Sequence, residues 1–550
     1  MRKLTSSRMT RGTLYGILST LCMCITLPAM AHPPAKGAKL PPSKAAADLK
    51  EVRRLRDQAK KDGKQDAARD ARIIELLNNA KRTLISEGRY ACCIKGGCEE
   101  CTMEMSCPCG QELSEGKEGS GVCKTCYDGW KKGEGAFEGI PLSEVKLAPM
   151  ERMAGMQGIH PGTMGDWSMS REASGTSWVP DDSPMYMKMA QLSEWETMFQ
   201  GYGYSVYTDQ GGKRGDNQFF VPTQVMGMAS KREGNHVFGL RAMFSLDPLL
   251  VGEKGYPLLF QTGETAHGKP LVDAQHPHDF TMELAGTYAH KLTEKGGIVS
   301  AYLAPVGEPA LGPSAFPHRP SALDNPEATL GHHWFDSTHI TYGVATLGAA
   351  TNAVKLEGSI FTGREPDENR WKWDKMRFDS YSGRVTINPS RNWSAQISHG
   401  FLKSPEALEP GTNEQRTTLT ASYGKSLSGS VHLAVTAGWA RKRLYEPDGH
   451  RRIGDAYLLE SAYLTPGYTA FGRYENVDKD ELFPGAAGHP KYNIHKFTIG
   501  GIKNVGRYSG AEFGIGGSVS AYAFPSSLKD SYGSNPVSFN IFLRARTTGM

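Results

Sequence analysis

The chain has 550 residues, of which 22% are charged and 39% apolar, and its mean hydropathy is -0.44. The formal net charge of +5 is small for this length, so composition gives no support for nucleic-acid binding. Beyond the first thirty residues no stretch approaches the ~20 consecutive apolar residues of a transmembrane helix, and the 63 glycines favour a turn-rich β protein. The length leaves room for more than one domain.

The N-terminus has the pattern of a bacterial signal peptide, predicted to cover residues 1–31. Basic residues over 2–11 precede an apolar run over 14–27, and Ala29-Met30-Ala31 forms a small-x-small cleavage site. We therefore expect the mature protein to be exported and to begin at His32.

Residues 32–90 are predicted to form a linker followed by amphipathic helices. The stretch 32–45 is rich in Pro, Ala and Lys. From 46 to about 87, apolar residues recur at helical spacing among many charged ones, with a break near Asp62-Gly63. This pattern favours a solvated helical spacer.

Eight cysteines define a predicted Cys-rich module over residues 91–130. Two Cys-x2-Cys pairs have the spacing that lets two thiolates bind one zinc ion, and one Cys-Pro-Cys sequence suits low-coordinate Cu(I). Four disulfides would explain eight cysteines in an exported protein equally well, so disulfides, metal and a mixture of the two remain open. No Cys-x-x-Cys-His sequence occurs, which argues against c-type haem. The cysteines are Cys92, Cys93, Cys98, Cys101, Cys107, Cys109, Cys123 and Cys126.

Methionine is concentrated in the next segment, which is predicted as a Met-rich linker over residues 131–192. Methionine normally fills protein cores, but Gly, Pro, Asp and Ser surround these residues and disfavour burial. Thioethers bind Cu(I) and persist where thiols oxidise, so metal capture and packing against or inside the next domain both remain open. The candidate ligands are Met150, Met153, Met156, His160, Met164, Met169, Met185, Met187 and Met189.

From residue 193 to 550 the sequence alternates with period two. In 511–521, Phe513, Ile515 and Val519 share one face, whereas Glu512 and Ser518 take the other. Strands of about ten residues with one apolar and one polar face are typical of an all-β, antiparallel, up-and-down transmembrane β-barrel. Sixteen strands are predicted, at 195–209, 217–230, 236–246, 280–291, 297–305, 337–349, 353–363, 377–388, 392–402, 415–426, 430–441, 455–465, 468–476, 492–504, 509–522 and 536–547.

The connections support the barrel, because short turns and long loops alternate along the chain. An even strand count, with one short-turn end and one long-loop end, is typical of bacterial outer-membrane barrels. A soluble β-sandwich or propeller gives no reason for this alternation. The C-terminal Thr-Thr-Gly-Met departs from the aromatic residue on which such barrels commonly end.

Charged residues on the polar face are predicted to point into the lumen of the barrel. Their mixed signs indicate no simple anion or cation filter, and a polar network that packs the lumen explains them equally well. The two longest loops, 247–279 and 306–336, are expected to fold inward. The lumen candidates are Arg241, Glu283, Lys355, Glu357, Arg384, Glu512, Arg544 and Arg546.

Histidines gather in and beside these two loops. Imidazoles and carboxylates at ligand-like intervals are typical of Cu(II) and Zn(II) sites, although a single loop histidine is more often just hydrogen-bonded. A metal site at the mouth of the pore is therefore one hypothesis. Its candidate ligands are His276, His278, His332, His333 and His339.

Six motifs between residues 175 and 367 resemble a family of largely uncharacterised bacterial outer-membrane proteins that accompany copper-resistance and heavy-metal efflux systems. The resemblance covers about 170–550, excludes the Cys-rich module, and implies an outer-membrane location more firmly than a mechanism. The motifs are GTSWVPDDSP at 175–184, LLFQTGET at 258–265, QHPHD at 275–279, GEPALGP at 307–313, HHWFDSTH at 332–339 and GREPD at 363–367.

The leading hypothesis is a non-enzymatic outer-membrane barrel that handles copper. The Cys- and Met-rich segments would capture the metal in the periplasm, with copper-resistance or efflux proteins as partners, and the barrel would pass it outward or hold it. The alternative is a porin-like channel for small solutes with a disulfide-stapled periplasmic adaptor. No local arrangement of nucleophile and base marks an enzyme.

Overall fold

The computed structural model describes residues 162–548 except 166, 293–296, 429–430 and 487, together with scattered residues between 47 and 79 and two short strands. The chain divides into two compact units, residues 1–147 and 148–550. In the first unit the described residues between 47 and 79 are helical, and β1 (Gly121–Val122) pairs in parallel with β2 (Lys146–Leu147). The predicted signal peptide, all eight cysteines of the Cys-rich module, Met150, Met153, Met156 and His160 lie outside the described residues.

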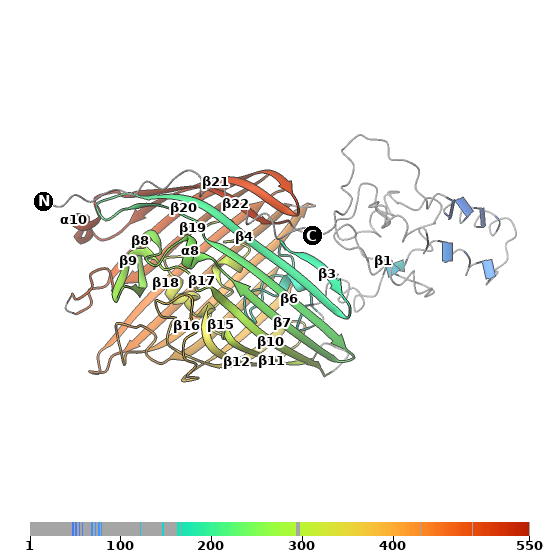
Figure 1. The fold of residues 1–550 in the computed structure, drawn as a ribbon, viewed down its shortest axis with the longest axis horizontal. Helices are drawn as coiled ribbons and strands as arrows, with labels where there is room; N and C mark the ends of the chain where they lie inside the picture. Colours follow the sequence, from blue (N-terminus) through green and yellow to red (C-terminus); the bar gives the residue numbers. More distant parts are fainter. Residues whose placement is uncertain are drawn as a thin grey trace. The chain divides into compact units, whose positions relative to one another are not determined.

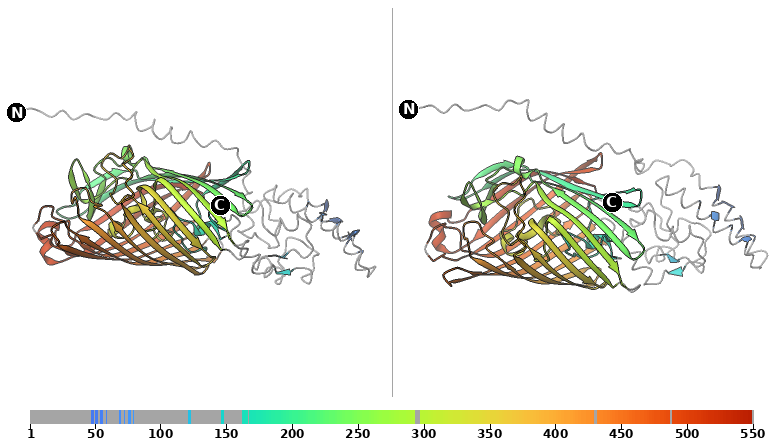
Figure 2. Two further views of the ribbon diagram at one scale, coloured as in Figure 1. Left: turned by 90° about the horizontal axis from the view of Figure 1, so that it is seen from below. Right: turned by 60° about the horizontal axis from the view of Figure 1, so that its bottom comes forward.

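The second unit contains a closed antiparallel β-barrel (Figure 1). β22 pairs with β4 and closes the wall. The wall has eighteen strands but only sixteen places around its circumference, because two places each hold two strands in succession. β5 and β6 pair with the same side of β4, and β3 and β22 pair with its other side. The predicted barrel of sixteen strands is confirmed, and Figure 2 shows its inclined strands from two further directions. The strands are β3 (Lys188–Leu192), β4 (Trp195–Gln210), β5 (Asn217–Phe220), β6 (Thr223–Glu233), β7 (His236–Phe244), β10 (Thr281–Lys291), β11 (Ile298–Gly307), β12 (Thr341–Ala350), β13 (Val354–Phe361), β14 (Ser380–Ser390), β15 (Trp393–Leu402), β16 (Asn413–Ser428), β17 (Val431–Tyr445), β18 (Arg451–Leu464), β19 (Tyr468–Lys479), β20 (Tyr492–Tyr508), β21 (Ala511–Ala523) and β22 (Val537–Thr547).

Two predicted strands differ from the observed ones for local reasons. The strand predicted at 217–230 is interrupted at Pro222, which has no backbone N–H to donate to the ladder. The strand predicted at 337–349 begins only at Thr341, because the residues before it form the short helices α9 (His332–Phe335) and η4 (Ser337–His339). His339 therefore lies on η4 and not in the wall.

The barrel wall is apolar outside and polar inside, the reverse of a soluble protein. In β21, Phe513, Ile515 and Val519 are 39–50% exposed, whereas Glu512 and Ser520 are at most 3% exposed. Exposed Leu, Ile, Val, Phe and Tyr residues recur on the outer face of nearly every strand. This alternation is expected of a barrel whose outer surface contacts lipid. Among the described residues no helix is long and apolar enough to cross a membrane.

The loop between β11 and β12 folds into the barrel and fills much of its lumen. Almost all of its residues from 308 to 340 are buried. It reaches several distant strands, since Gly312 N donates to Ser398 Oγ of β15 at 2.8 Å, and Lys496 Nζ of β20 donates to Glu327 Oε2 at 2.9 Å. The expectation that this loop folds inward is confirmed, and we call residues 308–340 the plug loop.

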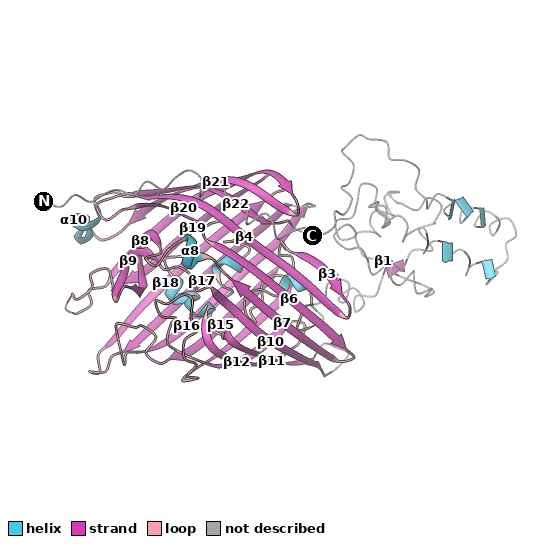
Figure 3. Cartoon of the chain, viewed as in Figure 1, coloured by secondary structure: helices cyan, strands magenta, loops and turns pink. Residues whose placement is uncertain are grey.

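The loop between β7 and β10 packs on the plug loop. It contains the short helix α8 (Asp247–Leu250) and a hairpin of β8 (Tyr256–Ala266) and β9 (Lys269–Gln275). Gln261 Nε2 donates to the carbonyl of Thr329 at 3.1 Å, so the hairpin is fixed to the plug loop. The short helices of both loops lie within the outline of the wall (Figure 3).

Residues 162–187, of which all but 166 are described, form a second largely buried segment inside the barrel. They fall in the range predicted as a Met-rich linker, for which metal capture and packing against or inside the barrel both remained open. Arg241 of β7 donates to the carbonyl of Gly175 at 2.7 Å, and Arg384 of β14 donates to Thr176 Oγ1 at 2.9 Å. Asn388 Nδ2 donates to the carbonyl of Val179 at 3.0 Å. The segment then continues directly into β3, so the barrel unit extends well before residue 193.

Candidate metal centre

Five histidines from two loops meet inside the barrel near its long-loop end. His276 and His278 lie between β9 and β10, His332 and His333 lie on α9, and His339 lies on η4. Each of the five is at most 9% exposed. The two short helices turn the chain back to the wall just before β12, and this turn brings the second group of histidines against the first.

The imidazole rings form one continuous cluster, which we call the histidine centre. The ring centroid of His332 lies 5.4 Å from that of His276, 5.3 Å from that of His333 and 5.2 Å from that of His339. The ring of His278 lies 5.3 Å from that of His339. The centre therefore brings into ring contact histidines that are 56 or more positions apart in the chain, such as His276 and His332.

The Nδ1 atom of every histidine in the centre lies within hydrogen-bond distance of an oxygen atom. Asp336 serves two of them, because its carboxylate faces His332 and its carbonyl faces His339. Such contacts to Nδ1 fix the tautomer and orientation of metal-ligating histidines and leave Nε2 for the ion. The distances are 3.3 Å from His276 to the Pro277 carbonyl, 2.8 Å from His278 to Asp247, 2.8 Å from His332 to Asp336, 3.1 Å from His333 to Glu365 and 2.8 Å from His339 to the Asp336 carbonyl.

The opposite nitrogen, Nε2, is buried without a hydrogen-bond partner in all five histidines. An unsatisfied buried polar group costs about 1–3 kcal/mol, so five in one cluster indicate a ligand that binds Nε2. Gly263, with φ +116°, lies against one of these atoms: a Cβ added there would come within 2.2 Å of His333 Nε2. The ring of His333 therefore occupies the position that a side chain at residue 263 would take, and glycine allows this close packing.

Burial favours the neutral form of three imidazoles of the centre, those of His276, His333 and His339. It lowers the pKa of His276 and His339 well below the usual value, and neighbouring His332 lowers both further. Burial also lowers the pKa of His333 to about 4, against the opposing effect of Glu365. A neutral imidazole is the form that binds a metal ion, so these groups are ready to act as ligands at neutral pH.

A second arrangement of ligand atoms lies beside His333. One ligand atom each of His333, Glu365 and Glu406 lies within 4.8 Å of the other two, and no other trio of His, Cys, Asp or Glu in the described part of the chain is spaced so closely. Lys442 lies 4.0 Å from Glu406, which opposes a cation there. We therefore assign the two carboxylates to the shell that orients His333. No three Nε2 atoms of the histidine centre all lie within 4.8 Å of one another, so binding of one ion by three of them requires the imidazoles to move closer together.

The structure brings together all five histidines that the sequence singled out, from loops whose proximity no local pattern indicates. Sequence reasoning missed the orienting groups Asp247 and Glu365 and the glycine at 263 against which His333 packs. Asp336 could have been identified from the sequence, because it lies four residues after His332, a spacing that brings two side chains together on a helical turn. Four of the six quoted motifs, at 258–265, 275–279, 332–339 and 363–367, contribute residues to the centre.

The other candidate residues lie elsewhere in the barrel. Met169 and Met187 form a buried cluster with Met198, against which Met185 and Met189 pack, and Met164 packs with Trp167 and Trp178. The eight charged lumen candidates all lie inside the wall as ion pairs: Arg241 with Glu283 at 3.2 Å, Lys355 and Arg384 with Glu357 at 3.3 and 3.0 Å, and Arg544 and Arg546 with Glu512 at 2.9 and 2.8 Å.

No protein-family model and no curated protein matches this sequence. Among solved structures, the chain is similar to Salmonella typhi OmpF in complex with daunomycin (9% identity, TM-score 0.41, 65% of this chain and 100% of that chain). It is also similar to Pseudomonas putida OprB (8%, 0.40, 64% and 94%) and to an anion-selective porin from Comamonas acidovorans (11%, 0.39, 64% and 100%). Matches at such low identity say nothing of what the barrel binds.

Proposed function

We propose that this protein is an outer-membrane barrel that handles a transition-metal ion and holds it at the histidine centre. The observation that carries the proposal is the set of five buried imidazoles whose Nδ1 atoms face oxygen atoms while their Nε2 atoms have no partner. Imidazole is a suitable ligand for copper and zinc, and also for iron and nickel. The apolar outer face of the wall supports the membrane location, and in barrels of this type the short turns lie on the periplasmic side.

Copper is the metal that we propose first, because the exported chain combines the histidine centre with cysteine- and methionine-rich sequence. The cysteines and the first methionines would capture the metal before it enters the barrel, together with periplasmic copper-resistance or efflux proteins. Zinc is the second candidate metal, and the Cys-rich module is its alternative site. The porin-like alternative retains the barrel fold, but the plug loop and residues 162–187 occupy its lumen, which disfavours a permanently open channel.

The test compares Cu(II) binding by the full chain and by the variant His332→Ala/His333→Ala, purified in detergent. Removing two ligands should weaken the site by more than the ~10–100-fold that loss of an orienting group typically causes. Electron paramagnetic resonance should show imidazole nitrogen couplings on Cu(II) in the wild type and lose them in the variant. The Cys-rich module is the same in both proteins, so any difference in Cu(II) binding between them comes from the histidines of the barrel.

A matched control removes two histidines outside the centre. His399 contacts Thr417 on an exposed strand position, and His450 lies in an exposed loop. The variant His399→Ala/His450→Ala should bind Cu(II) as the wild type does. Equal Cu(II) binding and unchanged spectra in all three proteins would reject the proposed centre.

A further inference from the structure

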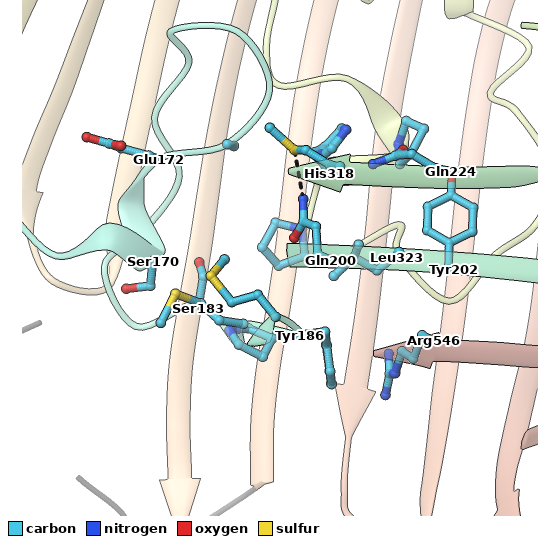
Figure 4. A pocket seen from close by; sticks show the side chains of 18 of the residues that line it. Ser170, Glu172, Ser183, Tyr186, Gln200, Tyr202, Gln224, His318, Leu323 and Arg546 are labelled. Atoms are coloured by element: carbon cyan, nitrogen blue, oxygen red, sulfur yellow. Dashed lines mark hydrogen bonds between the residues drawn. The ribbon is translucent and has the colours of Figure 1, made fainter. Parts of the chain in front are cut away.

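Methionines line a cavity of about 100 Å³ inside the barrel, which none of the five histidines of the centre lines. Residues 162–187 supply Met169, Met185 and Met187, and the lumen face of β6 supplies Met226 and Met228. Figure 4 shows sulfur atoms among the side chains that surround this space. Five thioethers from two separate parts of the chain therefore face one cavity that none of them fills.

A histidine with a free nitrogen completes the lining. His318 of η3 (Phe316–His318) borders the cavity, and its Nε2 atom is buried without a partner. Burial lowers the pKa of His318 to about 3, so its imidazole is neutral at physiological pH. Gln200 Nε2 lies 3.1 Å from the sulfur of Met226 and is the one polar side chain bonded to a thioether here (Figure 4).

The charged groups at the cavity already have partners, and the carboxylate of Glu172 accepts hydrogen bonds from Thr163, from the backbone N–H of Met164 and from Trp167 Nε1. Arg241 contacts Glu283 at 3.2 Å, and Arg546 contacts Asp324 at 2.9 Å and Glu512 at 2.8 Å. The guanidinium groups therefore bring little unbalanced positive charge to the site. Hydroxyl and amide oxygens also line the cavity, among them the unpartnered Oε1 of Gln224, but no carboxylate there is free. Five thioethers and a neutral imidazole therefore suit a soft monovalent ion better than a hard divalent cation.

We infer that this cavity is a binding site for a soft monovalent d10 metal ion, Cu(I) or Ag(I), held by methionine sulfur atoms and His318. Packing alone would use methionine to fill gaps, whereas here the thioethers surround a remaining space next to an unpartnered imidazole nitrogen. His318 lies two residues after Phe316, whose ring contacts His278 and His332, so the site adjoins the histidine centre. The inference does not depend on metal binding at that centre.

The experiment measures Ag(I) bound by the full chain, purified in detergent in chloride-free buffer, after gel filtration. The variant Met226→Leu/Met228→Leu removes two cavity thioethers, and Met→Leu exchanges of similar volume usually cost less than ~1.5 kcal/mol. We expect this variant to retain about one silver ion fewer per chain than the wild type, because its soft donors are lost. The cysteines contribute equally to both proteins and cancel in the difference.

The matched control is Met243→Leu/Met282→Leu. These methionines are also buried in the lumen face and pack against Met226 and Met228, but they do not line the cavity. The control should bind as much Ag(I) as the wild type. Heat-modifiable electrophoretic mobility verifies that each barrel is folded.

A second measurement locates the ion by residue. Saturating Ag(I) should slow peroxide oxidation of Met185 and Met187, followed by peptide mass spectrometry, while Met376, which is 40% exposed, oxidises at its usual rate. Both effects should persist in His332→Ala/His333→Ala. Equal silver content in wild type and both methionine variants, an equal loss in the control, or unprotected cavity methionines would each overturn the inference.

Discussion

The variant Arg319→Met is expected to lower the free energy of unfolding of the barrel by about 3–5 kcal/mol, because it removes one partner from a buried ion network. Arg319 is fully buried in the plug loop. Its guanidinium donates to Asp336 at 2.9 Å and to Glu460 of β18 at 2.6 Å. Without Arg319, two buried carboxylates lose a cation, and the plug loop loses its ion pair with Glu460 in the barrel wall.

Urea unfolding in lipid vesicles, followed by tryptophan fluorescence, measures the loss of stability. Single-channel recording in planar bilayers measures the second effect, since a loosened plug loop should give larger and more frequent conductance steps than the wild type. The control Arg441→Met breaks a pair with Asp455 whose arginine side chain is 34% exposed. Partly exposed pairs contribute about 0–1 kcal/mol, so this variant should stay close to the wild type in both measurements. Equal behaviour of Arg319→Met and Arg441→Met would show that Arg319 does not hold the plug loop.

The barrel could be predicted from sequence because its signal is repeated and local. Each strand carries the period-two pattern in its own ten or so residues, as Phe513, Ile515 and Val519 do in β21, and the turns confirm the register strand by strand. Errors arose where one residue breaks the pattern, as Pro222 does. They also arose where short helices replace the expected start of a strand, as before Thr341.

The interior of the barrel was harder to predict, because it depends on contacts between distant segments. The alternation that marks strands is absent from 162–187, and its Gly-, Pro- and Ser-rich composition looked like a linker. Nothing local shows that Arg241 donates to its backbone or that Arg384 donates to the hydroxyl of Thr176. The histidines were recognisable as possible metal ligands. Glu365, by contrast, lies beside His333 only because the plug loop folds into the barrel, and no local pattern indicates this contact.

Within the plug loop, Asp336 contacts both a histidine of the centre and the arginine that holds the loop to the wall. Its Oδ1 atom faces His332 Nδ1 at 2.8 Å, while Oδ2 accepts from Arg319 at 2.9 Å and from the backbone N–H of Phe316 at 2.9 Å. A change in the orientation of His332 on metal binding would therefore act on the ion pair that holds the plug loop. Glu365, by contrast, contacts His333 without touching Arg319.

Two isosteric variants separate these roles. Asp336→Asn and Glu365→Gln each weaken one Nδ1 contact in the centre, and each should lower Cu(II) affinity by about 10–100-fold, the usual effect of losing an orienting group. Asp336→Asn should destabilise the metal-free barrel more than Glu365→Gln does, because of these two carboxylates only Asp336 pairs with Arg319. Calorimetric titration with Cu(II) and urea unfolding without metal give the two values for each variant. Unchanged Cu(II) affinity in both variants would show that the carboxylates do not orient metal ligands. Equal stability of the two metal-free variants would show that the contact of Asp336 with His332 is not coupled to the ion pair that holds the plug loop.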